Sequence, residues 1–417
     1  MLTVGSCKLY KIAENKAEYK RMIRTLSNEN TGININPGQV NETLMDNFIK
    51  ELDGVEELHL IHDPSDIRKP YSEKTENLGK VRDLKSNIIN GYSSHNIVAI
   101  LPKDRSVHLI SHETYSNKDP NFLKAETVTK IQEDKDFDNK ADALELYNSG
   151  NYFNKKTLTK DILQASSKPI KEYNPDIKIH HILDREFDDN DYFDFIKNEL
   201  KDYFTIRAKK SRTIPKDKNS KEKAEKLIDH EFANSHQINV EKFQHKNKVY
   251  QNVVIDIRWD EYNGDQAVIV TIKNRNGKDV FKDPMLLITN APVNDKDEAY
   301  KIYIGYLKRS KIEYVFRFLK DGLGWEEMQV GNFEAIKNLL SLCFYVSSYL
   351  YDIGEEMAYD DYAIVLADLG GGKGKVTRYY IYEGIKCLMS KVRADRIFKK
   401  YKVSQETVDK MASMFET

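Results

Sequence analysis

The stretch that decides the fold is YLKRSKIEYVFRFLK, which covers residues 306–320. It places four polar side chains at successive offsets of three, four and seven residues: Tyr306, Arg309, Glu313 and Lys320. A helix turns by about 100° per residue, so these offsets bring the four side chains within roughly 60° of one another. The apolar residues fall on the opposite side: Ile312, Val315, Phe316 and Leu319. A lone carboxylate among cations, above an apolar face, predicts a buried site that handles phosphate groups.

Composition limits the class of protein. The chain has 417 residues, of which 40% are apolar and 11% aromatic, so a sizeable core and two or three domains are expected. Its net charge is only -1, so a polyanionic partner must be met by locally segregated positive charge. Two basic runs provide such charge, at 207–226 and at 373–402. Taken alone, each run is typical of a solvated surface.

The cysteines and histidines do not indicate a metal site. Cys7, Cys343 and Cys387 are far apart and form no CxxC pair, which argues against a cysteine zinc site and a disulfide framework and favours a reducing cytoplasm. The longest apolar run, at 339–353, is too short to span a bilayer and predicts a buried helix. Histidines such as His180 and His181 lie on strand-like segments without metal-ligand spacing, so we expect structural roles for them.

Hydrophobic patterning predicts a mixed α/β chain. Predicted strands cover 55–63, 96–102, 106–113, 176–184, 203–209 and 285–289, and a block of β-branched segments fills 207–284. Predicted helices cover 14–27, 39–52, 122–164, 191–200, 306–320 and 333–353, and the tail after residue 360 is expected to be helical and basic.

Two aspartates stand out beside Glu313. Asp63 and Asp184 each close an apolar strand and precede a polar loop, at the place where open α/β sheets gather their ligands. Either residue alone is more often a strand-end cap. Together with Glu313, however, three acids from distant parts of the chain can converge as oxygen ligands for Mg²⁺.

At these residues the chain resembles a known family. The stretch at 306–320 matches every named position of the Y-x-x-R-x-x-x-E-x-x-x-x-x-x-K signature of bacterial insertion-sequence DDE transposases, in the family 4 group. HILDREFDD, with Asp184, Arg185 and Asp188, looks like the D-R-x-x-D element around that family's second catalytic Asp. LHLIHDPSD is similar to the strand with the first Asp, here Asp63. FTIRAKKSR and LLITNAP resemble the segments that flank the family's insertion, so the resemblance covers roughly residues 55–350.

The resemblance implies an RNase-H-like mixed sheet flanked by helices, interrupted by a mostly β insertion domain, with helical N- and C-terminal regions. The implied division is a short helical region at 1–54, the first part of the catalytic core at 55–206, the β-rich insertion at 207–285, the second part of the core at 286–358 and a helical basic region at 359–417.

The resemblance also implies the chemistry. Asp63, Asp184 and Glu313 would hold two Mg²⁺ ions, with Mn²⁺ as a substitute, for endonuclease cutting of DNA and then strand transfer. Arg309 and Lys320 would hold phosphates and Tyr306 would position the DNA backbone or its water. Arg185 and Asp188 would support the site. Further DNA contacts are expected from the start of the first basic run: Arg207, Lys209, Lys210 and Arg212.

Double-stranded DNA, as transposon ends and as target, is the implied partner of a homodimer in the bacterial cytoplasm, at the nucleoid when bound, with no membrane association. Family members form a DNA hairpin in which a displaced base stacks on an aromatic residue. Here Met285 and Ser310 occupy places where aromatic residues are expected, which leaves Trp259 or Tyr262 as candidates.

Two other functions stay open at this point. Only about 60 residues precede Asp63, where the family usually has a longer helical domain that reads the DNA ends. A shortened transposase derivative that binds DNA or full-length transposase and regulates without transposing is therefore an alternative. An RNase-H-like nuclease acting on RNA:DNA hybrids is another, although the Tyr-Arg-Glu-Lys stripe argues against it.

Overall fold

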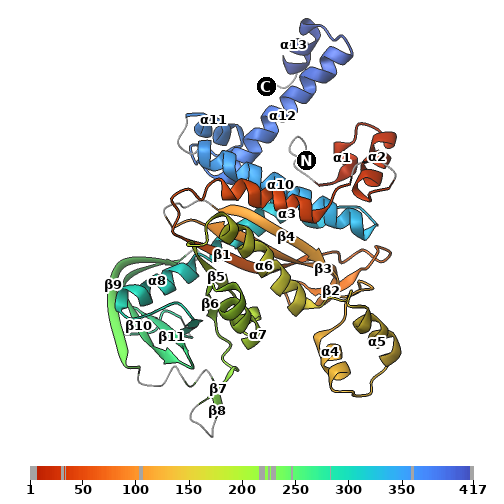
Figure 1. The fold of residues 1–417 in the computed structure, drawn as a ribbon. Helices are drawn as coiled ribbons and strands as arrows, with labels where there is room; N and C mark the ends of the chain where they lie inside the picture. Colours follow the sequence, from red (N-terminus) through yellow and green to blue (C-terminus); the bar gives the residue numbers. More distant parts are fainter. Residues whose placement is uncertain are drawn as a thin grey trace.

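The computed structural model describes residues 7–29, 32, 34–102, 107–215, 221–223, 226, 232–245, 248–281, 283–357 and 361–413. Within these residues one large sheet organises the chain, with strand order β2-β3-β1-β5-β6-β12-β11-β10-β9 and with β4 paired to β3 (Figure 1). Its strands are β1 Glu57–Arg68, β2 Gly79–Arg82, β3 Ile88–Ile100, β4 His108–Tyr115, β5 Lys178–Leu183, β6 Tyr203–Arg207, β9 Asn234–His245, β10 Lys248–Tyr262, β11 Asp265–Lys273 and β12 Met285–Thr289. A separate hairpin joins β7 Thr213–Pro215 to β8 Lys221–Lys223.

Helices cover both faces of this sheet. The α-helices of the described residues are α1 Leu9–Ile12, α2 Lys16–Leu26, α3 Pro37–Ile49, α4 Ala125–Gln132, α5 Lys140–Ser149, α6 Lys155–Tyr173, α7 Asn190–Asp194, α8 Lys296–Leu307, α9 Ser310–Arg317, α10 Phe333–Met357, α11 Asp361–Leu369, α12 Arg378–Lys400 and α13 Gln405–Ser413. Leu58 and Leu60 of β1 pack with Phe48 of α3 and Ile162 of α6. Side chains alternate along a strand, so Ile61 faces the other way, into the cluster that contains Ile312 of α9. The predicted α/β class, a mixed sheet flanked by helices, is confirmed and is consistent with an RNase-H-like fold.

Strand β1 is longer than the sequence predicts. Its parallel pairing with β5 ends at His62 and Leu183, but its antiparallel pairing with β3 continues to Arg68 and Gly91. The prediction that Asp63 closes the strand is therefore wrong. The polar residues after Asp63 hide the strand because they give no apolar alternation, whereas hydrogen bonding to β3 needs only the backbone.

The 306–320 stretch is not one regular helix. After α8 the backbone tightens, with bonds from Lys308 N to Gly305 O (3.2 Å) and from Arg309 N to Tyr306 O (3.0 Å). α9 then begins at Ser310, and a π-helix follows at Phe318–Gly322. Tight and wide turns rotate side chains by more and by less than 100° per residue. The prediction of a single helical stripe is therefore wrong.

Two regions extend from the centre of the fold. The strands of 234–273 continue the main sheet, because β12 pairs with both β6 and β11. Figure 1 shows α12 and α13 extending away from the sheet. The division of the chain into domains stays a prediction. Among the helices of the described segments, none combines the length and apolar character that a bilayer crossing requires.

Candidate active site

Three carboxylates meet at one guanidinium group. Arg309 Nη1 lies 3.1 Å from Asp63 Oδ2 and 3.8 Å from Asp184 Oδ2, and Arg309 Nη2 lies 3.1 Å from Glu313 Oε1. The two aspartate oxygens are thus no more than about 6.9 Å apart, the sum of the two Nη1 distances. Acids from three distant parts of the sequence therefore converge.

Strand register explains this convergence. Asp63 and Asp184 are the next residues after the last parallel pair, His62 and Leu183, so they lie side by side on adjacent strands. The alternation of side chains turns both toward the face that carries α9. Asp184 Oδ1 also accepts a hydrogen bond from the Arg185 backbone N–H at 2.7 Å, which orients its carboxylate.

Burial governs the electrostatics of the site. It raises the pKa of Asp63 to about 7, Asp184 and Glu313 act in the same direction, and Arg309 opposes them. Burial also disfavours the charge of Arg309, but the surrounding carboxylates outweigh it and raise the pKa of that guanidinium. The site thus concentrates negative charge that a proton, Arg309 or a metal cation must balance. Its oxygen-only donors are those that Mg²⁺ prefers.

Glu313 is less buried than predicted. Its side chain is 61% exposed, because it lies away from the buried apolar side of the helical segment. On that side Ile312, Val315 and Leu319 are fully buried, as expected, and Phe316 is partly buried. The carboxylate therefore faces solvent, where a cation or a substrate can reach it.

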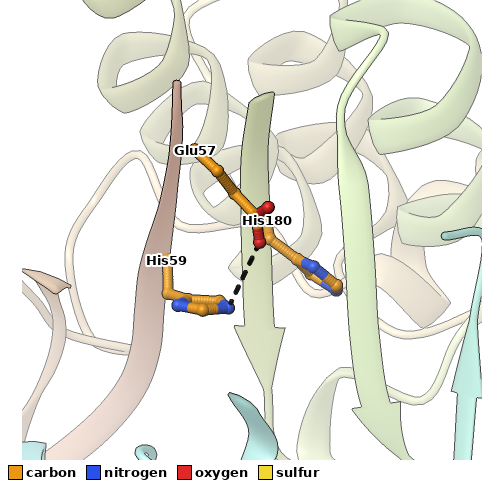
Figure 2. Close-up of side chains that lie close together, drawn as sticks. All are labelled: Glu57, His59 and His180. Carbon is orange, nitrogen blue, oxygen red and sulfur yellow. Dashed lines mark ion pairs between the residues drawn. The ribbon is translucent and has the colours of Figure 1, made fainter. Parts of the chain in front are cut away.

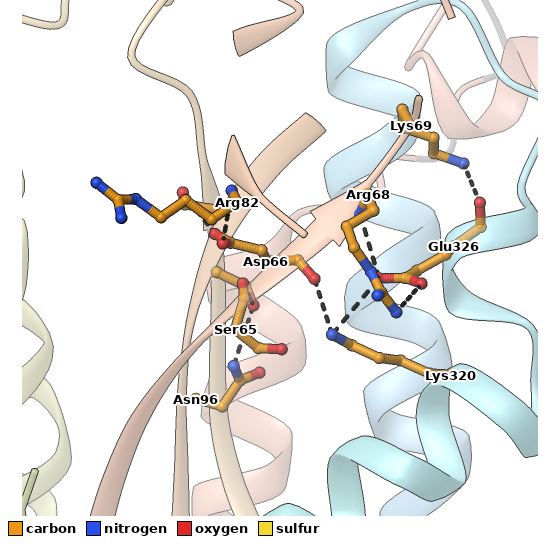
Figure 3. Close-up of polar contacts among 10 residues, drawn as sticks. Ser65, Asp66, Arg68, Lys69, Arg82, Asn96, Lys320 and Glu326 are labelled. Atoms are coloured by element: carbon orange, nitrogen blue, oxygen red, sulfur yellow. Dashed lines mark hydrogen bonds and ion pairs between the residues drawn. The ribbon is translucent and has the colours of Figure 1, made fainter. Parts of the chain in front are cut away.

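Lys320 does not join the stripe. Its Nζ donates to the Asp66 carbonyl oxygen at 2.9 Å and lies 3.5 Å from Glu326 Oε1 (Figure 3). Glu326 in turn accepts from Arg68 Nε at 2.8 Å and Nη2 at 2.7 Å. Asp66 is three residues beyond Asp63, about 10 Å along the strand. Lys320 therefore belongs to a second polar cluster, because the irregular helix turns it away from Glu313.

Tyr306, Arg185 and Arg207 surround Asp184. Burial raises the pKa of Tyr306 to about 12, and the nearby Asp184 adds to the shift. Burial and Arg185 lower the pKa of Arg207, whereas Tyr306 and Asp184 act in the opposite direction. The Nε atoms of Arg185 and Arg207 are buried without a hydrogen-bond partner. The guanidinium groups of Arg185 and Arg207 thus add positive charge beside the Asp184 carboxylate.

Residues 157–348 match the family model of the transposase DDE domain. The match includes Asp184, Arg309 and Glu313, whereas Asp63 precedes it. No curated protein matches the chain. This part of the chain is therefore similar to the transposase DDE domain, which supports a DDE transposase. The family 4 assignment stays a prediction.

Two other basic residues of the predicted set, Lys210 and Arg212, have side-chain partners within the protein. Arg212 forms an ion pair with Asp188 and lies 4.8 Å from the centre of the Phe193 ring. Asp188 also accepts from the Lys209 backbone N–H at 2.7 Å, and Lys210 pairs with Asp283. Asp188 thus supports the segment after β6 by its contacts with Lys209 and Arg212. DNA contacts by Lys209, Lys210 and Arg212 stay a prediction, and most of 216–226 lies outside the described residues.

A cavity of about 270 Å³ adjoins Arg207, which lies beside the carboxylate site. Its lining includes Met285 and the aromatic residues Phe243, Phe281 and Tyr303. Trp259 is only 5% exposed, so it is a poor candidate for stacking on a DNA base. Neither Phe243 nor Phe281 was predicted: Phe243 comes from β9, three strands across the sheet from Met285 on β12, and Phe281 lies outside the strands, four residues before Met285.

A second cluster of possible metal ligands was not predicted from the sequence. Glu57, His59 and His180 place one ligand atom each within 4.8 Å of one another, near the beginnings of β1 and β5. Judging the histidines by their spacing within each segment concealed this grouping. The available signal was Glu57-x-His59, because residues two apart on a strand share a face.

Proposed function

We propose that the protein is a metal-dependent transposase that cuts the ends of a DNA element by phosphodiester hydrolysis and joins the freed 3′ hydroxyl to target DNA. The observation that carries the proposal is the contact of one guanidinium, Arg309, with the carboxylates of Asp63, Asp184 and Glu313. Like-charged groups brought this close suit a site that binds cations.

Asp63, Asp184 and Glu313 would hold two Mg²⁺ ions, with Mn²⁺ as a substitute. When bound, the ions activate the attacking oxygen and stabilise the leaving oxygen. Without metal, Arg309 balances the negative charge of the three carboxylates. If cations balanced that charge instead, the planar guanidinium donors of Arg309 would be able to turn to the phosphate oxygens of DNA. The positive charges of Arg185 and Arg207 beside Asp184 would attract neighbouring phosphates, and Tyr306 would restrain the DNA backbone.

Double-stranded DNA, as element ends and as target, is the proposed substrate, and the protein would act on it as a homodimer at the bacterial nucleoid. The extended α12 supports pairing of protomers (Figure 1). Leu388, Val392 and Ile397 on this helix are each 43% exposed. The helix lies within the second basic run, so an apolar contact between protomers and phosphate contacts to DNA would share one element.

The cavity beside Arg207 supports a hairpin step. A flipped base needs an aromatic or apolar pocket for stacking. Phe243 and Phe281 would provide the stacking surface that Met285 cannot, next to a cation for the adjoining phosphate.

The test is cleavage of DNA that carries the sequences flanking the gene, in Mg²⁺. We expect Glu313→Gln to lose cleavage by more than about 100-fold while keeping DNA binding, since even outer-shell metal partners contribute about 10- to 100-fold. Glu327→Gln, at a similarly exposed glutamate of 55% exposure, should cleave like wild type. Binding of these ends without cleavage by wild type would indicate the regulatory derivative. Preferred cleavage of RNA:DNA hybrids would indicate the RNA nuclease.

A further inference from the structure

Two imidazoles and a carboxylate gather at the other end of the β1–β5 pair. His59 of β1 is in register with His180 of β5, and their ring centres are 5.6 Å apart. Glu57 lies two residues before His59 on the same face, with its Oε1 4.0 Å from His59 Nε2 (Figure 2). Four residues separate His59 from Asp63, about 13 Å along the strand. The cluster is therefore distinct from the carboxylate site.

A chain of hydrogen bonds fixes the orientation of His180. Its Nε2 lies 2.7 Å from Thr205 Oγ1, and that hydroxyl donates to Thr289 Oγ1 at 3.3 Å. Thr289 Oγ1 donates its own proton to the Phe204 carbonyl at 2.5 Å. The Thr205 hydroxyl has thus committed its proton and accepts one from His180 Nε2, which leaves the lone pair on Nδ1. Metal-binding histidines are oriented in this way by a partner on the other ring nitrogen.

The cluster has access to open space. Cavities of about 580 Å³ and 140 Å³ both include Glu57, His59, Lys301 and Gly305 in their linings. A Cβ on Gly305 would lie 3.3 Å from His59 Nε2, so the glycine lets α8 pass without a side chain against this nitrogen. An ion at the cluster would have room for water or another small ligand.

We propose that Glu57, His59 and His180 bind a divalent transition-metal ion of the Zn²⁺ class. Two imidazoles and one carboxylate suit Zn²⁺, Co²⁺ and Ni²⁺, whereas Mg²⁺ prefers oxygen ligands. Three protein ligands leave a coordination position that faces the cavity. The ion would fasten β1 to β5 because its ligands come from both strands.

Two lysines compete with the ion. Lys301 Nζ lies 2.6 Å from Glu57 Oε2, and its side chain is 62% exposed, so it can turn into solvent. Lys308 Nζ lies 3.4 Å from His59 Nδ1. Donation by Lys308 to Nδ1 puts the imidazole proton on Nε2, so Lys308 must move before Nε2 can bind metal. Removing Lys308 should therefore strengthen binding.

The test uses Co²⁺ as the probe, with the full chain and excess Mg²⁺, and follows the visible absorption of cobalt. We expect wild type to develop a saturable band, Glu57→Gln and His180→Gln to lose affinity by more than about tenfold, and Lys308→Met to gain affinity. Glu56→Gln removes the neighbouring exposed carboxylate and should leave the band unchanged. Glu57 is 22% exposed, so its variant tests the site even if His180→Gln fails to fold.

Asp63→Asn distinguishes the two ends of the strand pair. It should keep the cobalt band, because its site is separate from the imidazoles. A wild type without a band in excess Co²⁺ would overturn the proposal. So would a band that survives Glu57→Gln at full affinity, or one that disappears in Asp63→Asn.

Discussion

The two ends of the β1–β5 pair differ in chemistry although one rule builds both. At one end the paired side chains are Asp63 and Asp184, and at the other they are His59 and His180. Each pair is separated by 121 residues in the sequence, because both belong to the same parallel register. Strand register therefore decides which side chains lie together, and the type of those side chains decides which cation the site suits.

Burial drives both ends toward neutral side chains, with opposite consequences. It raises the pKa of Asp63 to about 7, whereas it lowers the pKa of His59 to about 2 and that of His180 to about 3. The neutral carboxyl group carries a proton and must lose it before binding a metal. A neutral imidazole is already the metal-binding form. Only the carboxylate end should therefore respond to pH near neutrality.

The largest expected effect separates the two ends by activity. Asp184→Asn should reduce DNA cleavage by more than about 100-fold, because it removes a proposed metal ligand rather than an outer partner. His180→Gln should change cleavage by less than about threefold in Mg²⁺, provided that circular dichroism shows it folded. Cleavage rates of the two purified variants, at equal DNA occupancy, make the comparison. Equal losses would mean that the two ends act as one site.

The sequence could predict this contrast only in part. The apolar strands, the signature and the adjacency of Asp63 and Asp184 follow from patterns along the chain and from the resemblance. The meeting of His59 with His180 depends on cross-strand register, which spacing within either segment does not reveal. The predicted position of Lys320 beside Glu313 was wrong for another reason. No sequence pattern predicts the tight turn at Lys308 and Arg309 or the π-helix that follows α9. The polar continuation of β1 to Arg68 could not be predicted, because its residues show no apolar alternation.

The second effect concerns the cation at the carboxylate end. Arg309→Gln should lower cleavage by about 10- to 100-fold, since it removes the proposed phosphate contact and the charge that holds down the Asp63 pKa. The pH profile of cleavage should therefore shift toward higher pH. Arg309→Lys should reverse this shift but restore activity only in part, because an ammonium lacks the planar fork. Arg317→Gln, an exposed change on the same helix, is the control. An unshifted profile in Arg309→Gln would contradict the role of Arg309 beside Asp63.

The third effect is the pH dependence of metal binding. Binding at the carboxylate end must displace the Asp63 proton, so the Mg²⁺ affinity should rise by up to about tenfold per pH unit below pH 7 and level off above it. Co²⁺ binding to the imidazole end should change little between about pH 6 and 8, since burial keeps those rings neutral. Isothermal titration calorimetry across this range measures both. An Mg²⁺ affinity that does not change with pH would contradict the proposed electrostatic difference between the two ends.

The smallest effect is on stability without metal. The folded pKa of Asp63, about 7, exceeds its ordinary value of 3.8, so the protonated group favours folding at low pH and this contribution is lost as pH rises through 7. His59 and His180 have the opposite sign, because their lowered pKa values make stability fall as pH drops below 6.5. In EDTA, Asp63→Asn should therefore stabilise the protein relative to wild type by on the order of 1 kcal/mol more at pH 8 than at pH 5. Urea unfolding at both pH values measures the difference, and an equal change at each would show that Asp63 titrates as it does in the unfolded chain.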